Sequence, residues 1–355
     1  MSKAPKPFRP MKTVNEALDF GDVNYPKFGS IKFDGVYAFV RDNKLLGRSL
    51  KPLKNKWITE QLSHPEFNGM VFETLNARMD GKDGLQLNRQ DLYNNSNSCT
   101  GTINKEDWDV TLVLFDYVKD CTGEYLENPY DVRMEHLNLL LSELDDKAFI
   151  TEHNICGIDY HEYMIRGITV LIPMPHLIED AEYARELYER IVAEGHEGLI
   201  LRCPMGVFKC GRATKKSQEM IRFKPSGDSE IIVTRMEEMM ENQNEAKTNE
   251  LGYTERSSHQ ENKVPLGMVG ALIGIDINSG IEVKIGAGKL THEQRKEVWD
   301  NRGDYIGRLA KYKFMDSGQK TLPRHPRLIG WRDLSDLDID AVRKLAKEKG
   351  VYLKE

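Results

Sequence analysis

The sequence predicts an α+β protein of two domains, in which mixed antiparallel sheets and helices precede a small β-barrel. Three observations support this prediction. The chain has 355 residues, more than one domain usually holds. Strand and helix patterns are mixed up to residue 225, without the regular alternation of a doubly wound fold. Five short strand patterns and one helix then follow. We therefore expect domains at residues 1–225 and 226–355.

Periodicity and punctuation define the elements of the first domain. Residues 178–193 form a clear amphipathic helix, which Gly195 ends. Residues 76–107 are polar and include the run Asn94-Asn95-Ser96-Asn97-Ser98, so we expect a partly mobile loop there. The other expected elements are helices at 13–20, 57–62 and 135–144, and strands at 31–40, 44–48, 70–75, 110–115 and 197–202.

The second domain has the pattern of an OB-fold. A hinge is expected at 226–228, and the polar insert 242–263 has almost no apolar residues, so its simplest interpretation is a disordered loop. A helix over 338–349 closes the chain. The expected barrel strands are 229–236, 266–277, 281–285, 312–314 and 328–331, with a helix at 291–300.

Composition excludes several classes of protein. No apolar run approaches the ~20 residues of a membrane span. Residues 1–10 are basic and proline-rich without an apolar core, so we expect no signal peptide. The five cysteines are scattered and show no C-x-x-C spacing, which predicts reduced thiols in an intracellular protein and no zinc site.

Charge is unevenly distributed along the chain. The net charge is −6, yet residues 44–56, 202–224 and 308–332 are strongly basic, and the acids are concentrated elsewhere. Three basic segments on an acidic chain fit a surface that binds a polyanion. Solvated basic faces explain the same segments equally well, so charge alone leaves both interpretations open.

Lys32 is the candidate nucleophile. It alternates with Ile31 and Phe33, so a strand would place Lys32 and Asp34 on one face. A lysine that is partly desolvated and close to other cations can lose its proton near neutral pH and attack an electrophile. On its own the pattern Lys-x-Asp-Gly is weak, and a solvated lysine before a turn is the simpler interpretation.

The order of the motifs changes that balance. The polar signatures follow one another as Lys32-Phe33-Asp34-Gly35, Arg48 in a Gly-Arg-Ser-Leu-Lys-Pro run, Glu73, Phe115-Asp116, Glu197-Gly198-Leu199-Ile200-Leu201-Arg202 and Arg222-Phe223-Lys224. This order resembles the covalent nucleotidyltransferase superfamily of DNA ligases, RNA ligases and mRNA-capping enzymes. Within it, residues 24–337 look like an ATP-dependent DNA ligase of the minimal viral or bacteriophage type, close to the chlorella-virus form. Residues 249–259 resemble the latch hairpin of minimal ligases.

The resemblance implies an adenylation (nucleotidyltransferase) domain, followed by the OB-fold domain, that together seal 5′-phosphate/3′-hydroxyl nicks in duplex DNA. The chemistry would pass through AMP on Lys32 and then through adenylylated DNA, with ATP and Mg²⁺ as cofactors and Mn²⁺ as a possible substitute. Asp34 and Lys224 would assist Lys32, and Phe115 would stack on adenine. The residues expected to bind the nucleotide are Ile31, Lys32, Arg48, Glu73, Phe115, Arg222 and Lys224. Glu73 and Glu197 would bind the metal. The residues expected to bind DNA phosphates are Arg48, Lys51, Arg212, Lys216, Arg256 and Arg327.

The resemblance also implies a monomer that clamps nicked duplex DNA in viral replication, repair and recombination, in the cytoplasm of a bacterial host. The sequence departs from the family at Tyr37, where arginine is usual, and no Arg-x-Asp-Lys motif occurs near Arg332. The alternatives are a capping-type guanylyltransferase, an RNA ligase, or an inactive OB-fold module that binds nicks. Only 31 residues precede Lys32 and no four-cysteine module is present, so we expect ATP rather than NAD⁺.

Overall fold

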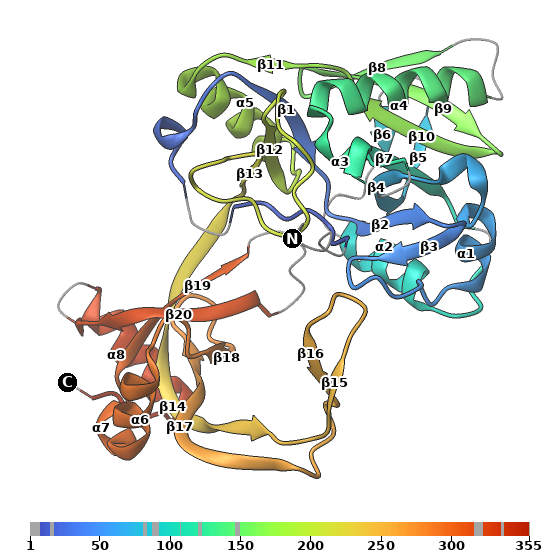
Figure 1. Ribbon diagram of the computed structural model, residues 1–355. Helices are drawn as coiled ribbons and strands as arrows, with labels where there is room; N and C mark the ends of the chain where they lie inside the picture. Colours follow the sequence, from blue (N-terminus) through green and yellow to red (C-terminus); the bar gives the residue numbers. More distant parts are fainter. Residues whose placement is uncertain are drawn as a thin grey trace. The chain divides into compact units, whose positions relative to one another are not determined.

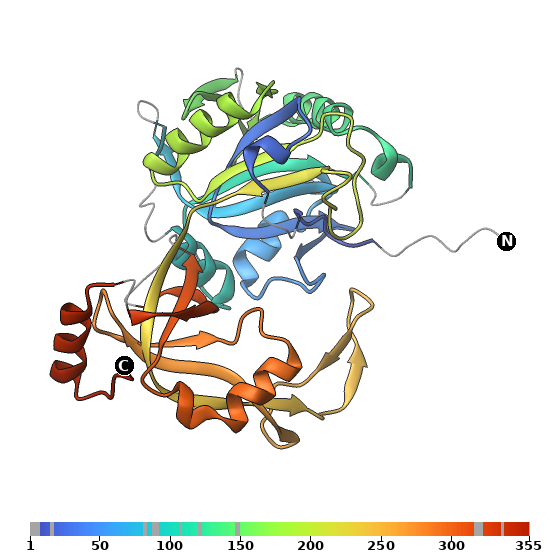
Figure 2. The same ribbon diagram turned by 90° about the vertical axis from the view of Figure 1, so that its left-hand side faces the viewer.

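The computed structural model describes residues 8–14, 18–80, 84–86, 92–106, 108–119, 123–145, 150–315, 322–334 and 337–354. The chain divides into two compact units, shown as ribbons in Figures 1 and 2. Unit 1 comprises Met1–Lys224 and Glu250–Gly252, and unit 2 comprises Pro225–Asn249 and Tyr253–Glu355. Within the described ranges, no helix has the length and apolar character needed to cross a membrane.

Unit 1 is built on two sheets, and its sheet pairs are antiparallel except that β7 and β10 run parallel. A small hairpin, β5 (Arg78–Asp80) and β6 (Gly84–Gln86), accompanies them. The four-stranded sheet has the order β11 (Leu177–Ile178), β1 (Lys27–Lys32), β12 (Gly198–Arg202) and β13 (Met220–Phe223). The seven-stranded sheet has the order β3 (Lys44–Gly47), β2 (Val36–Arg41), β4 (Met70–Asn76), β7 (Val110–Tyr117), β10 (Ile168–Pro173), β9 (Ile158–Ile165) and β8 (Thr151–Ile155).

Helices cover one face of each sheet. Helix α5 (Ala181–Ala193) begins after Asp180, whose side chain accepts a hydrogen bond from the Tyr183 N–H, and it packs on β12. Its buried Leu187 and Ile191 join Ile31 of β1 in one apolar core. The other helices of unit 1 are α1 (Lys56–Leu62), α2 (Leu92–Gly101), α3 (Gly123–Glu127) and α4 (Tyr130–Leu144), with short 3₁₀ turns η1 (Phe20–Asp22) and η2 (Pro65–Phe67).

The remaining faces of the two sheets meet in a further core that lies beside the candidate site. Because side chains alternate along β1, Ile31 points toward α5 while Ser30 and Lys32 point to the opposite face. Tyr37 of the seven-stranded sheet and Met220 of the four-stranded sheet belong to the same apolar cluster. Helix α4 packs on the other face of the seven-stranded sheet. Polar side chains near this shared cluster can therefore come from both sheets.

Several predictions for unit 1 are confirmed and others are wrong. The helices expected at 57–62, 135–144 and 178–193 are present, although the last begins at Ala181 and Ile178 belongs to β11. The single strand expected at 31–40 is wrong, because β1 ends at Lys32 and β2 begins at Val36 in the other sheet. Residues 15–17 of the helix expected at 13–20 lie outside the described residues, and η1 forms its end.

The loop expected at 76–107 is also wrong, since it contains β5, β6 and helix α2. Helix α2 buries small polar residues together with Leu92 and Cys99, which conceals it from an apolar pattern. Ser96 is fully buried, and its hydroxyl oxygen accepts a hydrogen bond of 2.9 Å from the Asn76 N–H. Local polarity was therefore a poor guide here, because hydrogen bonds satisfy the buried groups.

Unit 2 is a closed five-stranded barrel, which confirms the OB-fold prediction. Residues 226–228, where a hinge is expected, form the start of β14 directly after the break between the two units, and Ser226 pairs there with Met315 of β19. The barrel order is β14 (Ser226–Asn242), β17 (Lys263–Asp276), β18 (Glu282–Gly286), β20 (Arg324–Arg332) and β19 (Leu309–Met315), with helices α6 (His292–Asp300), α7 (Arg302–Tyr305) and α8 (Ile339–Lys349).

The insert between β14 and β17 is a hairpin in the structure rather than an irregular loop. Strands β15 (Ala246–Thr248) and β16 (Thr254–Arg256) pair antiparallel, and Lys247 faces Glu255. Asn244, buried at the base, donates hydrogen bonds from its side chain to the carbonyls of Ser257 and His259. The Arg256 guanidinium donates to the Asn244 carbonyl. Backbone pairing and side-chain amides thus hold a segment that lacks an apolar core.

Candidate active site

Lys32 is the last residue of β1, and its amine lies against a carboxylate. Lys32 is paired with Gly198 across the sheet, so that Glu197 directly precedes its partner. The Lys32 Nζ donates a hydrogen bond to Glu197 Oε2. The Glu197 side chain is 4% exposed and that of Lys32 is 24% exposed, so the amine can be reached while the acid is enclosed. The register of β1 and β12 thus joins residues 165 positions apart.

Glu73, on β4 of the other sheet, completes a cluster of charges around Lys32. Burial raises the pKa of the Glu73 carboxyl to about 7, against the lowering effect of Lys32 and Arg48. Glu197 and Asp34 raise the same pKa further by repulsion. Three carboxylates and two cations therefore share one electrostatic environment, and they include the motif residues Lys32, Arg48, Glu73 and Glu197.

Two glycines of the motifs are required by close approach of neighbouring strands. A Cβ atom at Gly35 would lie 2.4 Å from Leu75 Cδ2 and 2.7 Å from the Thr74 carbonyl oxygen, both on β4. Gly198 has a φ of +147°, and a Cβ there would lie 2.0 Å from the Phe223 carbonyl oxygen on β13. A larger residue at either position would push apart strands that carry site residues.

Tyr37 occupies the position where the resembling family usually has arginine. Its ring is buried, and the Arg48 guanidinium lies over it with Cζ 4.7 Å from the ring centroid. The Phe115 ring lies 5.9 Å from the Tyr37 ring, centroid to centroid. Burial raises the pKa of the Tyr37 hydroxyl, which keeps it neutral. A cation, that of Arg48, therefore lies directly over the side chain of Tyr37.

Behind Phe115, a buried carboxylate is paired with two arginines. Arg133 donates to Asp116 through Nε at 2.7 Å and Nη2 at 3.1 Å, and Arg202 donates through Nη1 at 2.9 Å. Burial raises the pKa of Asp116, but the two guanidinium groups outweigh it and hold the pKa below its ordinary value. The Arg202 Cζ also lies 5.7 Å from the Phe115 ring centroid. This triad joins β7, α4 and β12 beneath the predicted adenine platform.

The sequence analysis did not single out Arg133 or Lys12. Lys12 forms a β-bridge with Arg212, in which the Lys12 N–H donates to the Gly211 carbonyl at 2.6 Å. Burial lowers the pKa of Lys12, and the positive charges of Arg212, Arg48 and Arg9 lower it further. Four cations, including Arg48, therefore gather in this place, an arrangement that favours a bound anion. The only sequence signal was the basic character of the first residues.

The other predicted site residues of unit 1 lie around this centre. Ile31 has its side chain in the core, and its N–H donates to the Tyr160 hydroxyl at 3.1 Å, so neither group is directed at the charged cluster. Arg222 lies on β13 opposite Ile200. Lys51, Lys216 and Lys224 lie in the segments after β3, before β13 and directly after β13, respectively.

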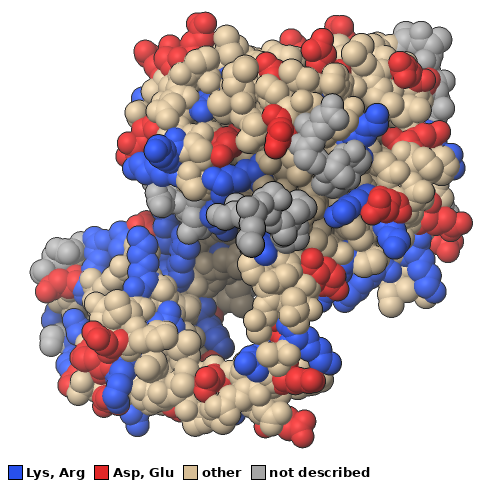
Figure 3. All heavy atoms as spheres, viewed as in Figure 1, with Lys and Arg blue, Asp and Glu red and all other residues tan. Residues whose placement is uncertain are grey.

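Unit 2 carries the remaining two predicted phosphate-binding residues. Arg256 is an exposed residue of the β16 strand in the hairpin. Arg327 of β20 is exposed and is paired with Lys313 of the neighbouring strand β19. Figure 3 shows Lys and Arg side chains gathered on the visible face of this unit over β19 and β20. These strands thus present the basic segment predicted at 308–332 as a surface.

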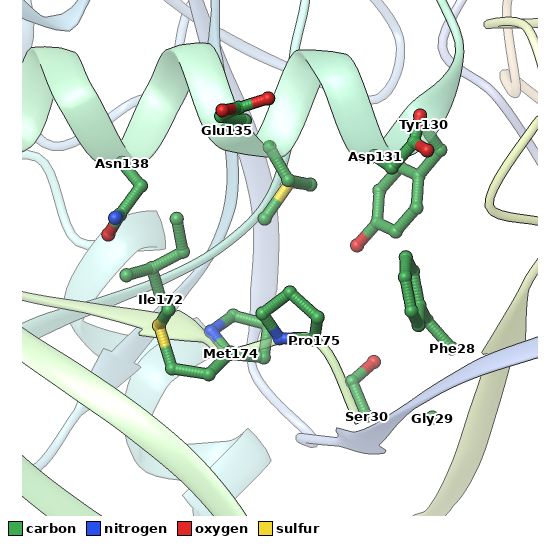
Figure 4. Close-up of a pocket in the computed structure, with 12 residues that line it drawn as sticks. Phe28, Gly29, Ser30, Tyr130, Asp131, Glu135, Asn138, Ile172, Met174 and Pro175 are labelled. Carbon is green, nitrogen blue, oxygen red and sulfur yellow. The ribbon is translucent and has the colours of Figure 1, made fainter. Parts of the chain in front are cut away.

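A separate apolar pocket opens beside β1. It has a cavity of about 280 Å³ between β1, helix α4 and the segment after β10, and Phe28, Ser30 and Tyr130 line it (Figure 4). Glu135 and Asn138 of α4 lie at its polar side. Its lining includes neither Lys32 nor Glu73, so it is distinct from the charged cluster described above.

Comparisons with known proteins agree with this architecture. Residues 262–332 match the family model described as DNA ligase OB-like domain. A DNA ligase from Methanococcus aeolicus is 24% identical over 251 residues, covering 65% of this chain and 39% of that protein. The chain thus spans less than half the length of this curated relative.

Among solved structures, one from a structure–function study of Lig E DNA ligases has a TM-score of 0.58 and 16% identity, covering 93% of this chain and 100% of that one. Chlorella virus DNA ligase-adenylate has a TM-score of 0.46 and 19% identity, covering 92% and 100%. The structure with a TM-score of 0.58 shows that the chain has the fold of DNA ligases, and the family model shows a DNA ligase OB-like domain, so the resemblance to DNA ligases drawn from the motifs is confirmed.

Proposed function

We propose that this protein is an ATP-dependent DNA ligase that joins a 5′-phosphate to a 3′-hydroxyl at nicks in duplex DNA. The observation that carries the proposal is the contact between the Lys32 amine and the enclosed Glu197 carboxylate, with Glu73 and Arg48 in the same site. The DNA ligase fold and OB-like domain support the choice of a nicked duplex as the substrate.

Lys32 acts as the nucleophile in the first step. Its nitrogen attacks the α-phosphorus of ATP, a nitrogen–phosphorus bond forms, and the bond to pyrophosphate breaks. The amine must be neutral to attack, and Glu197, its hydrogen-bond partner, is the nearest base for the departing proton. The nick 5′-phosphate then takes AMP from Lys32, and the 3′-hydroxyl finally displaces AMP to form the phosphodiester. Asp34 orients the reacting groups beside Lys32.

Glu73 and Glu197 would hold Mg²⁺, for which Mn²⁺ is the expected substitute. Their carboxylate oxygens are the hard ligands that this ion prefers. Burial raises the Glu73 pKa and the negative charge of Glu197 raises it further, and a bound divalent cation would favour the charged carboxylate against both effects. When bound, the ion neutralises charge that develops on the phosphate oxygens.

The nucleotide would lie between the two sheets. Phe115 and Ile200 are partly buried members of one apolar cluster and provide faces for adenine. The buried Tyr37 hydroxyl has no hydrogen-bond partner within the described part of the chain, and a polar group of the nucleotide would satisfy it. Arg48, Arg222 and Lys224 would bind phosphate oxygens.

DNA would be bound through its backbone by both units of a monomer. Lys51, Arg212 and Lys216 of unit 1 and Arg256 and Arg327 of unit 2 would contact phosphates, so binding should be salt-sensitive and independent of sequence. The hairpin β15–β16 would close around the duplex as a latch. The biological role we propose is replication and repair of viral DNA in the cytoplasm of a bacterial host.

Label transfer tests the chemistry. The protein is incubated with Mg²⁺ and α-labelled ATP or GTP, resolved on a denaturing gel, and chased with nicked duplex DNA. We expect label from ATP alone, discharged into sealed product by a 5′-phosphorylated nick. Label from GTP would indicate a capping-type enzyme, discharge by nicked RNA alone an RNA ligase, and no label an inactive nick-binding module.

The Lys32→Ala variant assigns the nucleophile. It should bind nicks but form no AMP adduct, whereas Lys44→Ala, an exposed lysine of β3, should label like the wild type. An adduct recovered on another lysine of Lys32→Ala would overturn the assignment.

A further inference from the structure

Three side chains that commonly bind metals meet in unit 1 outside the proposed catalytic set. Cys156 lies in the turn between β8 and β9, Glu194 caps the end of α5, and His196 lies in the connection to β12. Their ligand atoms all lie within 4.8 Å of one another. The Cys156 thiol donates to Glu194 Oε2 at 3.2 Å. Cys156 and His196 are each 6% exposed while Glu194 is exposed, so a cation could enter from the Glu194 side.

Hydrogen bonds hold the backbone at or next to each of these residues, and the Glu194 N–H donates to the Arg190 carbonyl at 3.0 Å. The β8–β9 turn uses left-handed conformations at Cys156 and Gly157, with φ of 56° and 87°, and the Asn154 side chain accepts from the Gly157 N–H at 3.1 Å. After α5, the His196 N–H donates to the Ile191 carbonyl at 3.1 Å. The His196 ring packs edge-on against Phe33, centroid to centroid 5.4 Å. The ligands therefore sit on ordered elements rather than on a long loop.

We propose that Cys156, Glu194 and His196 bind a divalent cation of the zinc class, with water in the fourth position. A thiolate and an imidazole favour this class over Mg²⁺, which prefers oxygen ligands. Zinc–ligand distances of about 2.0–2.3 Å place the ligand atoms roughly 3.5 Å apart, so atoms that now lie up to 4.8 Å apart must approach one another by at most about 1.3 Å. The Cys156 thiol gives up its proton to solvent on binding.

The local charge is compatible with this ion. The thiolate and the Glu194 carboxylate contribute two negative charges, and the nearby Arg190 guanidinium, which donates to the Cys156 carbonyl at 3.4 Å, contributes one positive charge. A bound ion would join the β8–β9 turn to the chain directly before Glu197. Cysteine spacing could not reveal such a site, because its ligands come from one cysteine and two residues about forty positions away.

Cobalt substitution tests the site in the full-length, untagged, reduced protein. We expect one equivalent of Co²⁺ to produce a thiolate-to-cobalt charge-transfer band that Zn²⁺ removes by competition. Co²⁺ held by carboxylates alone, as at Glu73 and Glu197, lacks this band, so the signal separates the two sites. Zinc should also raise the melting temperature of the wild type.

Three variants and one control locate the ligands. Cys156→Ser should abolish the band, and His196→Gln and Glu194→Gln should each weaken Co²⁺ binding by at least about tenfold, because even the outer partners of metal ligands cost about 10–100-fold. Cys210→Ser removes a partly exposed thiol outside the cluster and should leave the band intact. Circular dichroism of the metal-free variants confirms folding. No band in the wild type, or a band that survives Cys156→Ser, would overturn the proposal.

Discussion

Replacing Asp116 with Asn is expected to destabilise unit 1 by about 3–5 kcal/mol. Asp116 is completely buried and accepts two hydrogen bonds from Arg133 and one from Arg202. The amide keeps the shape of the side chain but removes its charge, and both guanidinium groups remain enclosed. Removing one partner of a buried ion pair costs about 3–5 kcal/mol, and here two cations lose their counter-charge, so we expect the upper part of that range.

The chain offers a matched control on its surface. Arg78 donates to Asp109 through Nε at 3.1 Å and Nη2 at 2.8 Å, so the pair has the same chemistry. The side chains are 75% and 50% exposed, however, and exposed pairs contribute at most about 1 kcal/mol. Asp109→Asn should therefore cost at least about 2 kcal/mol less than Asp116→Asn.

The measurement should report on unit 1 alone, because a chain of two units need not unfold in one transition. Hydrogen exchange in increasing urea, followed by mass spectrometry on peptides of β4 and β7, provides local free energies of opening. The effect of pH gives a second check. Because the folded-state pKa of Asp116 lies below its ordinary value, its stabilisation is complete above about pH 4 and is lost only as the pH falls through the lower folded value.

Equal destabilisation by Asp116→Asn and Asp109→Asn would refute the reasoning. So would a difference between wild type and Asp116→Asn that already shrinks between about pH 8 and 5, because the carboxylate should remain charged throughout that range.

Three more perturbations test other features. Lys12→Ala should weaken nick binding and reduce the slope of log affinity against log salt by about 0.9, whereas the exposed Lys105→Ala should not; equal slopes would remove Lys12 from the phosphate contacts. Gly35→Ala should abolish lysine adenylylation, because its Cβ would lie 2.4 Å from Leu75 Cδ2 on β4. Gly21→Ala, whose Cβ would have nothing within 4 Å, should leave adenylylation unchanged. An active Gly35→Ala variant would show that β4 can shift to make room for the methyl group. Replacing residues 245–256 by a short Gly-Ser linker should weaken nick binding and preserve adenylylation, and loss of adenylylation would contradict the latch assignment.

The sequence predicted best those elements whose signals are local. Helix α5 has an apolar stripe and an aspartate cap, and β4 and β7 have apolar runs, so their positions agreed within a few residues. The barrel of unit 2 was found because its strands follow one another with regular spacing. The break between β1 and β2 was missed, because apolar alternation continues through residues 33–35 while the chain passes from one sheet to the other.

For the candidate site, too, the sequence predicted some of the residues and missed others. The motif order predicted that Lys32, Glu73 and Glu197 belong together, and the structure places them in one charged cluster. The cation at Lys12 and the Asp116–Arg202 pair could not be predicted from local pattern. Lys12 bridges to Arg212, and Arg202 reaches Asp116 across 86 positions, so only the packed sheets define these partners.

The contact between Lys32 and Glu197 has a consequence for folding kinetics. Lys32 ends β1 and Glu197 directly precedes the neighbouring strand β12, yet the two residues are 165 positions apart, and Glu73 of the same charged cluster lies on the other sheet. Contacts between residues so far apart in the sequence form slowly, because the intervening chain must lose conformational entropy before any contact compensates for that loss. Refolding protein should therefore recover its helical signal well before it can be labelled. The time at which the proposed labelling of Lys32 becomes possible would then report when both sheets of unit 1 have assembled.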